Sequence, residues 1–141
     1  PILNEFFWTS KGKGSWCNDR RLRVSNRSNL SDCLIGTGLP FGERIYKNYL
    51  SEIDEILKTT AGIRRFGSAG LDLAYVAAGK LDGFWEADLN LWDLSTGTLL
   101  VKEAGGRISK INGEDWNIDC REILASNSNI HIDLSKKLSL L

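Results

Sequence analysis

Short apolar runs that alternate with amphipathic segments are the feature that most constrains the fold of this chain. After residue 30 the runs "DCLIGTG", "GIRRFGS" and "LDGFWEA" each predict a strand, and each is followed by a stretch with helical spacing of apolar residues. Parallel strands need such a crossover connection, whereas antiparallel neighbours can be joined by a tight turn. The pattern therefore predicts a partly parallel sheet that is covered by helices on both faces.

The segments around these strands predict the remaining elements. Apolar residues at helical spacing predict a helix within residues 44–60, namely Ile45, Tyr49, Ile53, Ile56 and Leu57. The stretches "AGLDLAYVAAG" and "DLSTGTLLVKEAGG" predict helices that end at glycines, and the first 25 residues alternate around "KGKG" like an antiparallel meander. "GRISKIN", "REILASN" and "IHIDLSKKLSLL" add two strands and a terminal helix. We expect the core to contain Leu73, Val76, Leu99, Leu100 and Val101.

Length and charge exclude several classes of protein. The 141 residues suit one globular domain, and 18 basic against 18 acidic residues leave no net charge to attract nucleic acid or an anionic membrane. The apolar runs are shorter than the roughly 18 residues of a membrane span. Three widely spaced cysteines and a single histidine, His131, argue against a disulfide framework and a multi-histidine metal site. We therefore expect a soluble, cytoplasmic protein.

Acidic residues and tryptophans gather where the strand "LDGFWEA" ends and the next helix begins. Strand alternation predicts one face with Asp82, Phe84 and Glu86 and the other with Leu81, Gly83 and Trp85. Glu86 alone could be a solvated charge at the strand end, and Asp93 alone could cap the helix that follows it. Beside Trp85 and Trp92, however, unpaired carboxylates are costly, and a hard cation such as Mg²⁺ would relieve that cost.

The stretch "RRFGSAGLD" joins a predicted strand to a predicted helix. The free N–H groups and the positive dipole end of such a helix could receive an oxygen-rich ligand, which suits a phosphate or a polyol. In the simpler interpretation the glycines only shape the turn and Ser68 is an ordinary helix cap. Turn and cap statistics favour the simpler interpretation.

Taken together, these residues resemble the inositol monophosphatase family. Its C-terminal signature has W-D followed by small residues and, about ten positions on, E-A-G-G, which Trp92, Asp93 and residues 103–106 match in order and spacing. The similarity extends back to "PILNEFFWTSKGKGSW", and "RRFGSAGLDLAYVAAGKLDGF" is similar to the bacterial inositol-1-monophosphatases. The resemblance implies an α/β fold, the C-terminal part of a layered α/β/α/β/α sandwich with a mixed sheet flanked by helices.

The resemblance also implies an activity and a set of site residues. It implies an Mg²⁺-dependent phosphomonoesterase, often a homodimer, that hydrolyses inositol monophosphate or a similar polyol phosphate by direct attack of water. Asp93 matches a direct Mg²⁺ ligand that also lies against a substrate hydroxyl, and Glu86 matches a residue that contacts the polyol. Gly67, Ser68 and Ala69 match the turn that lines the same pocket.

Two family motifs, a G-E-E segment and D-P-[LI]-D-G-T, do not occur in this sequence. In the family they precede the meander and supply most metal ligands and the residues that activate water. The chain also contains no methionine and begins at Pro1. We therefore expect residues 1–141 to be the C-terminal portion of a longer protein, without the N-terminal metal-binding half, and we expect no catalytic residue and no activity in this chain alone.

Other functions stay open at this point. A bisphosphate nucleotidase or a fructose bisphosphatase could share the metal motif, although Glu86 and the G-S-A turn favour an inositol-type polyol. From another class, some bacterial relatives act as partners of the transcription machinery. The pair Arg64 and Arg65 could then contribute to a partner or dimer surface, although such pairs are more often solvated charges. We expect no membrane partner and no direct binding of nucleic acid.

Overall fold

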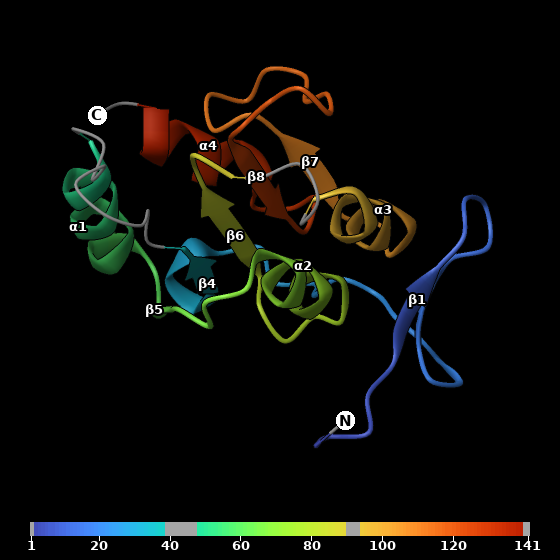
Figure 1. Cartoon of the computed structure of the whole chain (residues 1–141). Helices are drawn as coiled ribbons and strands as arrows, with labels where there is room; N and C mark the ends of the chain where they lie inside the picture. The colour runs from blue at the N-terminus through green and yellow to red at the C-terminus, as the bar shows by residue number, and fades with distance from the viewer. Residues whose placement is uncertain (1, 39–47, 90–93, 140–141) are drawn as a thin grey trace.

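The computed structural model describes residues 2–38, 48–89 and 94–139. Within them, a small antiparallel meander opens the chain, and a five-stranded sheet with helices on both faces follows (Figure 1). The strands are β1 (Phe7–Thr9), β2 (Ser15–Cys17), β3 (Arg20–Arg21), β4 (Leu34–Thr37), β5 (Gly62–Arg64), β6 (Gly83–Glu86), β7 (Arg107–Ser109) and β8 (Ile123–Ser126). The helices are α1 (Tyr49–Thr59), α2 (Ala69–Ala77), α3 (Ser95–Glu103) and α4 (His131–Ser139), with a 3₁₀ turn η1 (Leu30–Asp32) before β4.

The larger sheet is mixed, with the strand order β5-β4-β6-β8-β7 in the described part of the chain. β4 pairs in parallel with β5 and with β6, whereas β8 pairs antiparallel with β6 and β7. Because β5, β4 and β6 run in the same direction, their carboxyl ends at Arg64, Thr37 and Glu86 meet at one edge of the sheet. This edge is where α/β proteins commonly bind ligands.

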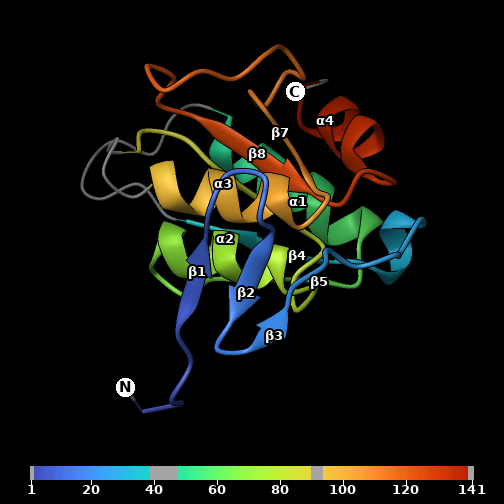
Figure 2. The ribbon, with the colours of Figure 1, turned by 90° about the vertical axis from the view of Figure 1, so that its right-hand side faces the viewer.

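The helices cover the sheet on both faces, as the alternation of strands and helices predicts. α2 and α3 lie between the sheet and the meander, and α1 and α4 lie on the opposite face (Figures 1 and 2). Neighbouring side chains of β6 point to opposite faces, so Phe84 packs with α2 and α3 while Trp85 packs with α1 and α4. The described residues thus form four layers, and the predicted α/β class with a mixed sheet flanked by helices is confirmed.

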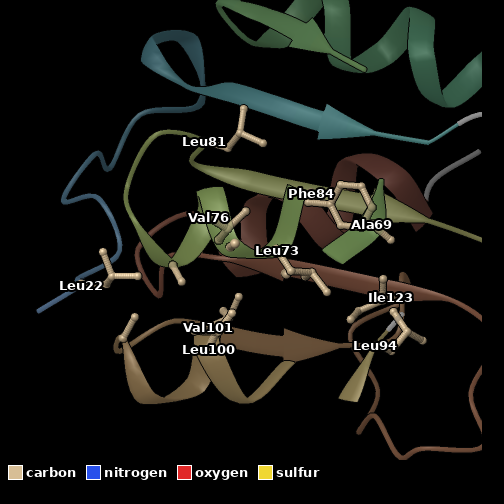
Figure 3. Close-up of a cluster of buried hydrophobic side chains, with 14 of the residues drawn as sticks. Leu22, Ala69, Leu73, Val76, Leu81, Phe84, Leu94, Leu100, Val101 and Ile123 are labelled. Atoms are coloured by element: carbon tan, nitrogen blue, oxygen red, sulfur yellow. The ribbon is translucent and has the colours of Figure 1, made fainter. Parts of the chain in front are cut away.

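Most of the predicted core is buried between α2, α3 and the sheet (Figure 3). Leu73, Val76, Leu100 and Val101 are buried as predicted, whereas Leu99 is only half-buried. Leu81 packs in the same cluster as Phe84, so its predicted position on the opposite face is wrong. The reason is that β6 begins only at Gly83, and strand alternation does not extend to a residue before the strand.

On α1 the predicted apolar stripe is only partly buried. Tyr49 and Ile56 are buried and Ile53 is half-buried, but Leu57 is 55% exposed. Leu57 lies one residue beyond Ile56, and a rotation of about 100° per residue turns it from the buried face of the helix toward solvent. Ile45 lies outside the described residues.

Side-chain contacts tie the meander to α3. The carboxylate of Glu103 accepts hydrogen bonds from the backbone N–H groups of Gly12 (2.7 Å) and Gly14 (3.1 Å). The hydroxyl of Ser15 donates to the carbonyl oxygen of Leu100 at 2.7 Å. These bonds fix the outer layer to the helix that follows the acidic segment.

All three cysteines are free thiols, as the odd count and wide spacing indicate. Cys17 and Cys33 are buried, and burial is the main cause that raises the pKa of Cys33 to about 11. A thiol with such a pKa stays protonated and unreactive at neutral pH. None of the helices in the described ranges is long and apolar enough to cross a membrane.

Candidate functional site

The candidate site lies at the carboxyl edge of the three parallel strands, where Glu86 packs over Gly38. Thr37 of β4 pairs with Trp85 of β6. The next residue after each of them, Gly38 and Glu86 respectively, therefore lies at the edge. A Cβ atom added at Gly38 would overlap the carboxylate of Glu86. Only glycine therefore leaves room for this carboxylate. The sequence signal for this contact is the "GTG" at the end of the buried strand β4, although Gly38 was not among the predicted site residues.

The predicted turn from Gly67 to Ala69 follows β5 at the same edge. Gly67 has a φ of +79°, in the left-handed region that glycine adopts without strain. The side-chain oxygen of Ser68 accepts a hydrogen bond from the N–H of Leu71 at 3.3 Å, so Ser68 is the N-cap of α2. Ala69 is buried next to Phe84, two residues before Glu86 (Figure 3). The start of α2 and the end of β6 therefore lie on the same face of the sheet.

Asp93 and Trp92 lie outside the described residues. The helix that follows them, α3, begins at Ser95, and its N-cap position is taken by Leu94, whose side chain is buried and apolar. Both interpretations of Asp93, as a helix cap and as a metal ligand, concern a residue outside the described ranges and stay predictions.

Polar side chains support the edge from the α1 side. The hydroxyl of Thr37 donates to the carbonyl oxygen of Trp85 (3.1 Å), and the indole N–H of Trp85 donates to Glu52 (3.0 Å). Burial raises the pKa of Tyr49, a hydrogen bond with Thr37 and the charge of Arg65 oppose this rise, and the charge of Glu86 adds to it. Tyr49, Arg65 and Glu86 therefore share one electrostatic environment at the edge.

A second carboxyl group, that of Asp72, lies beneath the edge on the inner face of α2. Asp72 is 1% exposed, and its Oδ1 has no hydrogen-bond partner among the described residues. Burial raises the pKa of Asp72 to about 7. Asp72 was not among the predicted site residues, although an aspartate inside the apolar stretch "GLDLAYVAA" is the signal that marks it.

The donor groups at this edge suit Mg²⁺ in kind but not in number. Mg²⁺ prefers octahedral oxygen coordination, with carboxylates and retained waters. Glu86 contributes a carboxylate there, but residues 2–38, 48–89 and 94–139 contain no group of three or more His, Cys, Asp or Glu side chains that could hold a metal ion. A complete magnesium site at this edge therefore needs ligands beyond the described residues.

Two other buried titratable groups have structural surroundings. Asp82, at the amino end of β6, accepts hydrogen bonds from the hydroxyl of Ser25, from Arg27 (3.2 Å) and from the N–H of Leu34 (2.8 Å). His131 lies between the hydroxyls of Ser109 and Ser126, each 2.7 Å from a ring nitrogen, and burial lowers its pKa to about 4. Both groups lie away from the carboxyl edge and join neighbouring elements to one another.

Comparison with known proteins gives concordant matches. The inositol monophosphatase family matches residues 1–139. An inositol-1-monophosphatase from Caulobacter vibrioides is 43% identical over 141 residues, which cover 98% of this chain and 55% of that protein. A protein named Nus factor SuhB from Pseudomonas aeruginosa is 47% identical over 131 residues, 91% of this chain and 48% of that protein. The solved inositol monophosphatase from Anabaena is 38% identical, with a TM-score of 0.94 over 100% of this chain and 56% of that one. The chain thus spans about half the length of the relatives that it matches.

Proposed function

Because this chain belongs to the inositol monophosphatase family, we propose that it forms part of an Mg²⁺-dependent phosphatase acting on inositol monophosphate or a similar polyol phosphate. The observation that carries the proposal is the carboxylate of Glu86, which packs over Gly38 on the same face as the start of α2. A carboxylate accepts hydrogen bonds from hydroxyl groups, and the N–H groups at a helix start suit phosphate or polyol oxygens. This combination fits a substrate that carries both kinds of group.

Each site residue has a distinct role in this proposal. Glu86 accepts hydrogen bonds from hydroxyl groups of the polyol, and the backbone of Gly67, Ser68 and Ala69 lines the same pocket. Asp93 would supply a carboxylate oxygen to Mg²⁺ and would contact a substrate hydroxyl. When bound, Mg²⁺ supplies activation of the attacking water and stabilisation of the leaving oxygen.

We further propose that the other metal ligands come from outside this chain. One carboxylate does not hold Mg²⁺ tightly, and the family's G-E-E and D-P-[LI]-D-G-T segments do not occur in the sequence. Residues 1–141 would then be the C-terminal portion of a longer phosphatase and inactive when isolated. Phosphatase activity from the purified chain alone would contradict this part of the proposal.

The intact enzyme is proposed to be a cytoplasmic homodimer. Leu50 and Leu57 lie on α1 seven residues apart, which places them close to one face of the helix, and they are 67% and 55% exposed. Exposed apolar side chains at this spacing suit contact with another protein surface. A monomer in analytical ultracentrifugation at micromolar concentration would argue against a dimer.

Substitution of Asp93 by asparagine in the intact protein tests the enzymatic function. Asparagine keeps the shape of the side chain but removes one negative charge from the metal site, so we expect turnover to fall at least about a hundredfold. Mg²⁺ affinity, measured by titration calorimetry, should fall as well, while the melting temperature changes little. Normal turnover in Asp93→Asn would remove this residue from the metal site.

Asp88→Asn is the matched control for this experiment. Asp88 lies five residues before Asp93, and its carboxylate pairs with Arg121 at 2.8 Å on the surface. The substitution removes the same charge near the site, yet surface changes of this kind have small effects, so turnover should stay within about twofold of wild type. Equal losses in both variants would indicate a general effect of charge rather than a metal ligand.

A second candidate function is binding to the transcription machinery. It is favoured by relatives such as the Pseudomonas aeruginosa protein, whose name is Nus factor SuhB. Arg64 and Arg65 are exposed at the end of β5, where they could contact such a partner. A pull-down that is sensitive to salt, survives Asp93→Asn and is lost when both arginines are replaced by alanine would favour this function. Loss of Mg²⁺-dependent hydrolysis in Asp93→Asn would favour the enzyme.

A further inference from the structure

Asp72 lies beneath the carboxyl edge of the parallel strands, between α2 and β4. It follows Ala69 by three residues, so it lies about one helical turn further along α2. A Cβ atom at Gly36 would lie 3.2 Å from its Oδ1, which shows that the carboxyl packs against the backbone of β4. Gly36 precedes Gly38 by two residues, and side chains two apart on a strand share one face. Asp72 and Glu86 therefore lie over successive positions on the same face of β4.

The surroundings of this carboxyl are apolar. Leu81 and Phe84 approach the same position on Gly36, at 2.8 Å and 3.3 Å from the added Cβ atom. Few charged residues lie on the elements packed against Asp72. Asp82 precedes β6 and Glu86 ends it, and α3 carries Lys102 and Glu103. β4 and β8 contain no charged residue. Asp82 is bonded to Arg27, and Glu103 is bonded to the meander. The ammonium group of Lys102 lies 5.9 Å from the ring centroid of Trp116, and Glu86 is itself negative, so no positive charge on these elements is placed to pair with Asp72.

An ionised carboxylate is strongly disfavoured in such surroundings, so the neutral acid is the form that fits them. This agrees with the pKa of about 7 that burial gives Asp72. A neutral carboxyl has nearly the shape of a carboxamide, and both groups can donate and accept hydrogen bonds. Ionisation would favour entry of water between α2 and β4. Such a change would move Ala69, at the start of α2, relative to Glu86.

Resting on the proposed phosphatase function, we propose that Asp72 is a positioning residue whose neutral carboxyl holds the start of α2 against the Gly36–Gly38 segment. Asp72 does not contact the substrate in this arrangement. It acts through Ala69 on α2 and through the backbone beneath Glu86, the two sides of the polyol pocket. The neutral form keeps these two sides at a fixed separation.

Kinetics of three intact enzymes test the positioning role: wild type, Asp72→Asn and Asp72→Ala. Asparagine reproduces the neutral side chain, so kcat/KM at pH 6.5 should stay within about threefold of wild type. Alanine leaves a gap under the pocket, and misplacement of the binding groups should raise KM and lower kcat/KM at least about tenfold. The ratio of kcat/KM between Asp72→Asn and wild type should rise at least about threefold from pH 6.5 to 8.5, because only wild type ionises.

Two spectroscopic readouts do not depend on activity. Infrared difference spectra between pH 6 and pH 9 should contain a neutral-carboxyl stretch in wild type that is absent in Asp72→Asn. The amide NMR signals of Gly38 and Ala69 should shift with the same titration in wild type only. Identical infrared spectra, or amide signals that do not follow the titration, would overturn the proposal. A wild-type enzyme without phosphatase activity would instead reject the proposed function, and the amide titration would still decide the role of Asp72.

Discussion

Gly38→Ala is the substitution that tests the geometry of the pocket most directly. The added Cβ atom would overlap the carboxylate of Glu86, and the backbone of Gly38 is not in the left-handed region, so alanine itself is tolerated there. The carboxylate is the far end of a flexible side chain, and it should move aside while the strand stays in place. The variant therefore displaces Glu86 without removing it.

The expected loss follows from the hydrogen bond that the displaced carboxylate would make with a substrate hydroxyl. Hydrogen bonds to charged groups are worth about 1.5–3 kcal/mol, which corresponds to about ten- to hundredfold in kcat/KM. If Glu86 holds the polyol equally in the ground state and the transition state, the loss appears mainly as a higher KM. The free energy of unfolding should change by less than about 1 kcal/mol.

The assay is steady-state hydrolysis of inositol monophosphate by the intact enzyme, together with urea denaturation. Gly83→Ala is a matched control, since its Cβ atom would meet Leu134 at 2.9 Å on the other face of β6. Overpacking there should lower the free energy of unfolding by about 1–3 kcal/mol while KM stays unchanged. The two glycines should thus separate an effect on binding from an effect on stability.

A double-mutant cycle decides whether Gly38→Ala acts through Glu86. In a Glu86→Ala background the carboxylate is already gone, so the further effect of Gly38→Ala on KM should be less than about twofold. Additive losses in the two single variants, or a normal KM in Gly38→Ala, would refute the reasoning that links this glycine to substrate binding.

Three further outcomes concern stability. Glu103→Ala should speed tryptic cleavage after Lys11 or Lys13, because the meander turn loses the carboxylate that binds its N–H groups; an unchanged cleavage rate would contradict this. Because burial lowers the pKa of His131 from 6.5 to about 4, the unfolded state binds more protons in this window, and stability should fall by up to about 3 kcal/mol as the pH drops through it. Urea titrations of His131→Gln should lack this component. Because burial raises the pKa of Asp72 from 3.8 to about 7, stability should instead fall by up to about 4 kcal/mol as the pH rises from 4 to 7, and Asp72→Asn should lack that fall.

The order and type of the elements follow from local patterns in the sequence. The apolar run of β4, the helical spacing of α2 and the alternation in β6 each depend on residues close together in the chain, and all three elements are where those patterns predict them. The strand pattern fails where the strand has not yet begun. Leu81 precedes the first residue of β6, so alternation along the strand does not determine the face on which it lies.

The pocket details depend on contacts between distant parts of the chain. The carboxylate of Glu86 lies over Gly38 because Thr37 pairs with Trp85, which is 48 residues away in the chain. A local sequence pattern contains no information on that register. Asp72 was overlooked for a similar reason. Its burial depends on Gly36 and Phe84 of the sheet, whereas the helix pattern alone gives an aspartate no reason to face inward.

The E-A-G-G motif shows that a family signature can combine chemistry with packing. Glu103 binds the meander turn, so its carboxylate is already occupied at the outer layer. A Cβ atom at Gly106 would lie 2.6 Å from Val101 and 2.9 Å from the carbonyl oxygen of Ser126, so this glycine allows α3 and β8 to approach closely. The described part of the motif therefore has structural roles. Under the proposed function, the chemistry of the signature would come from Asp93. Asp93→Asn should then lose turnover, whereas Glu103→Ala should lose the contact with the meander, and this contrast would separate the two parts of the signature.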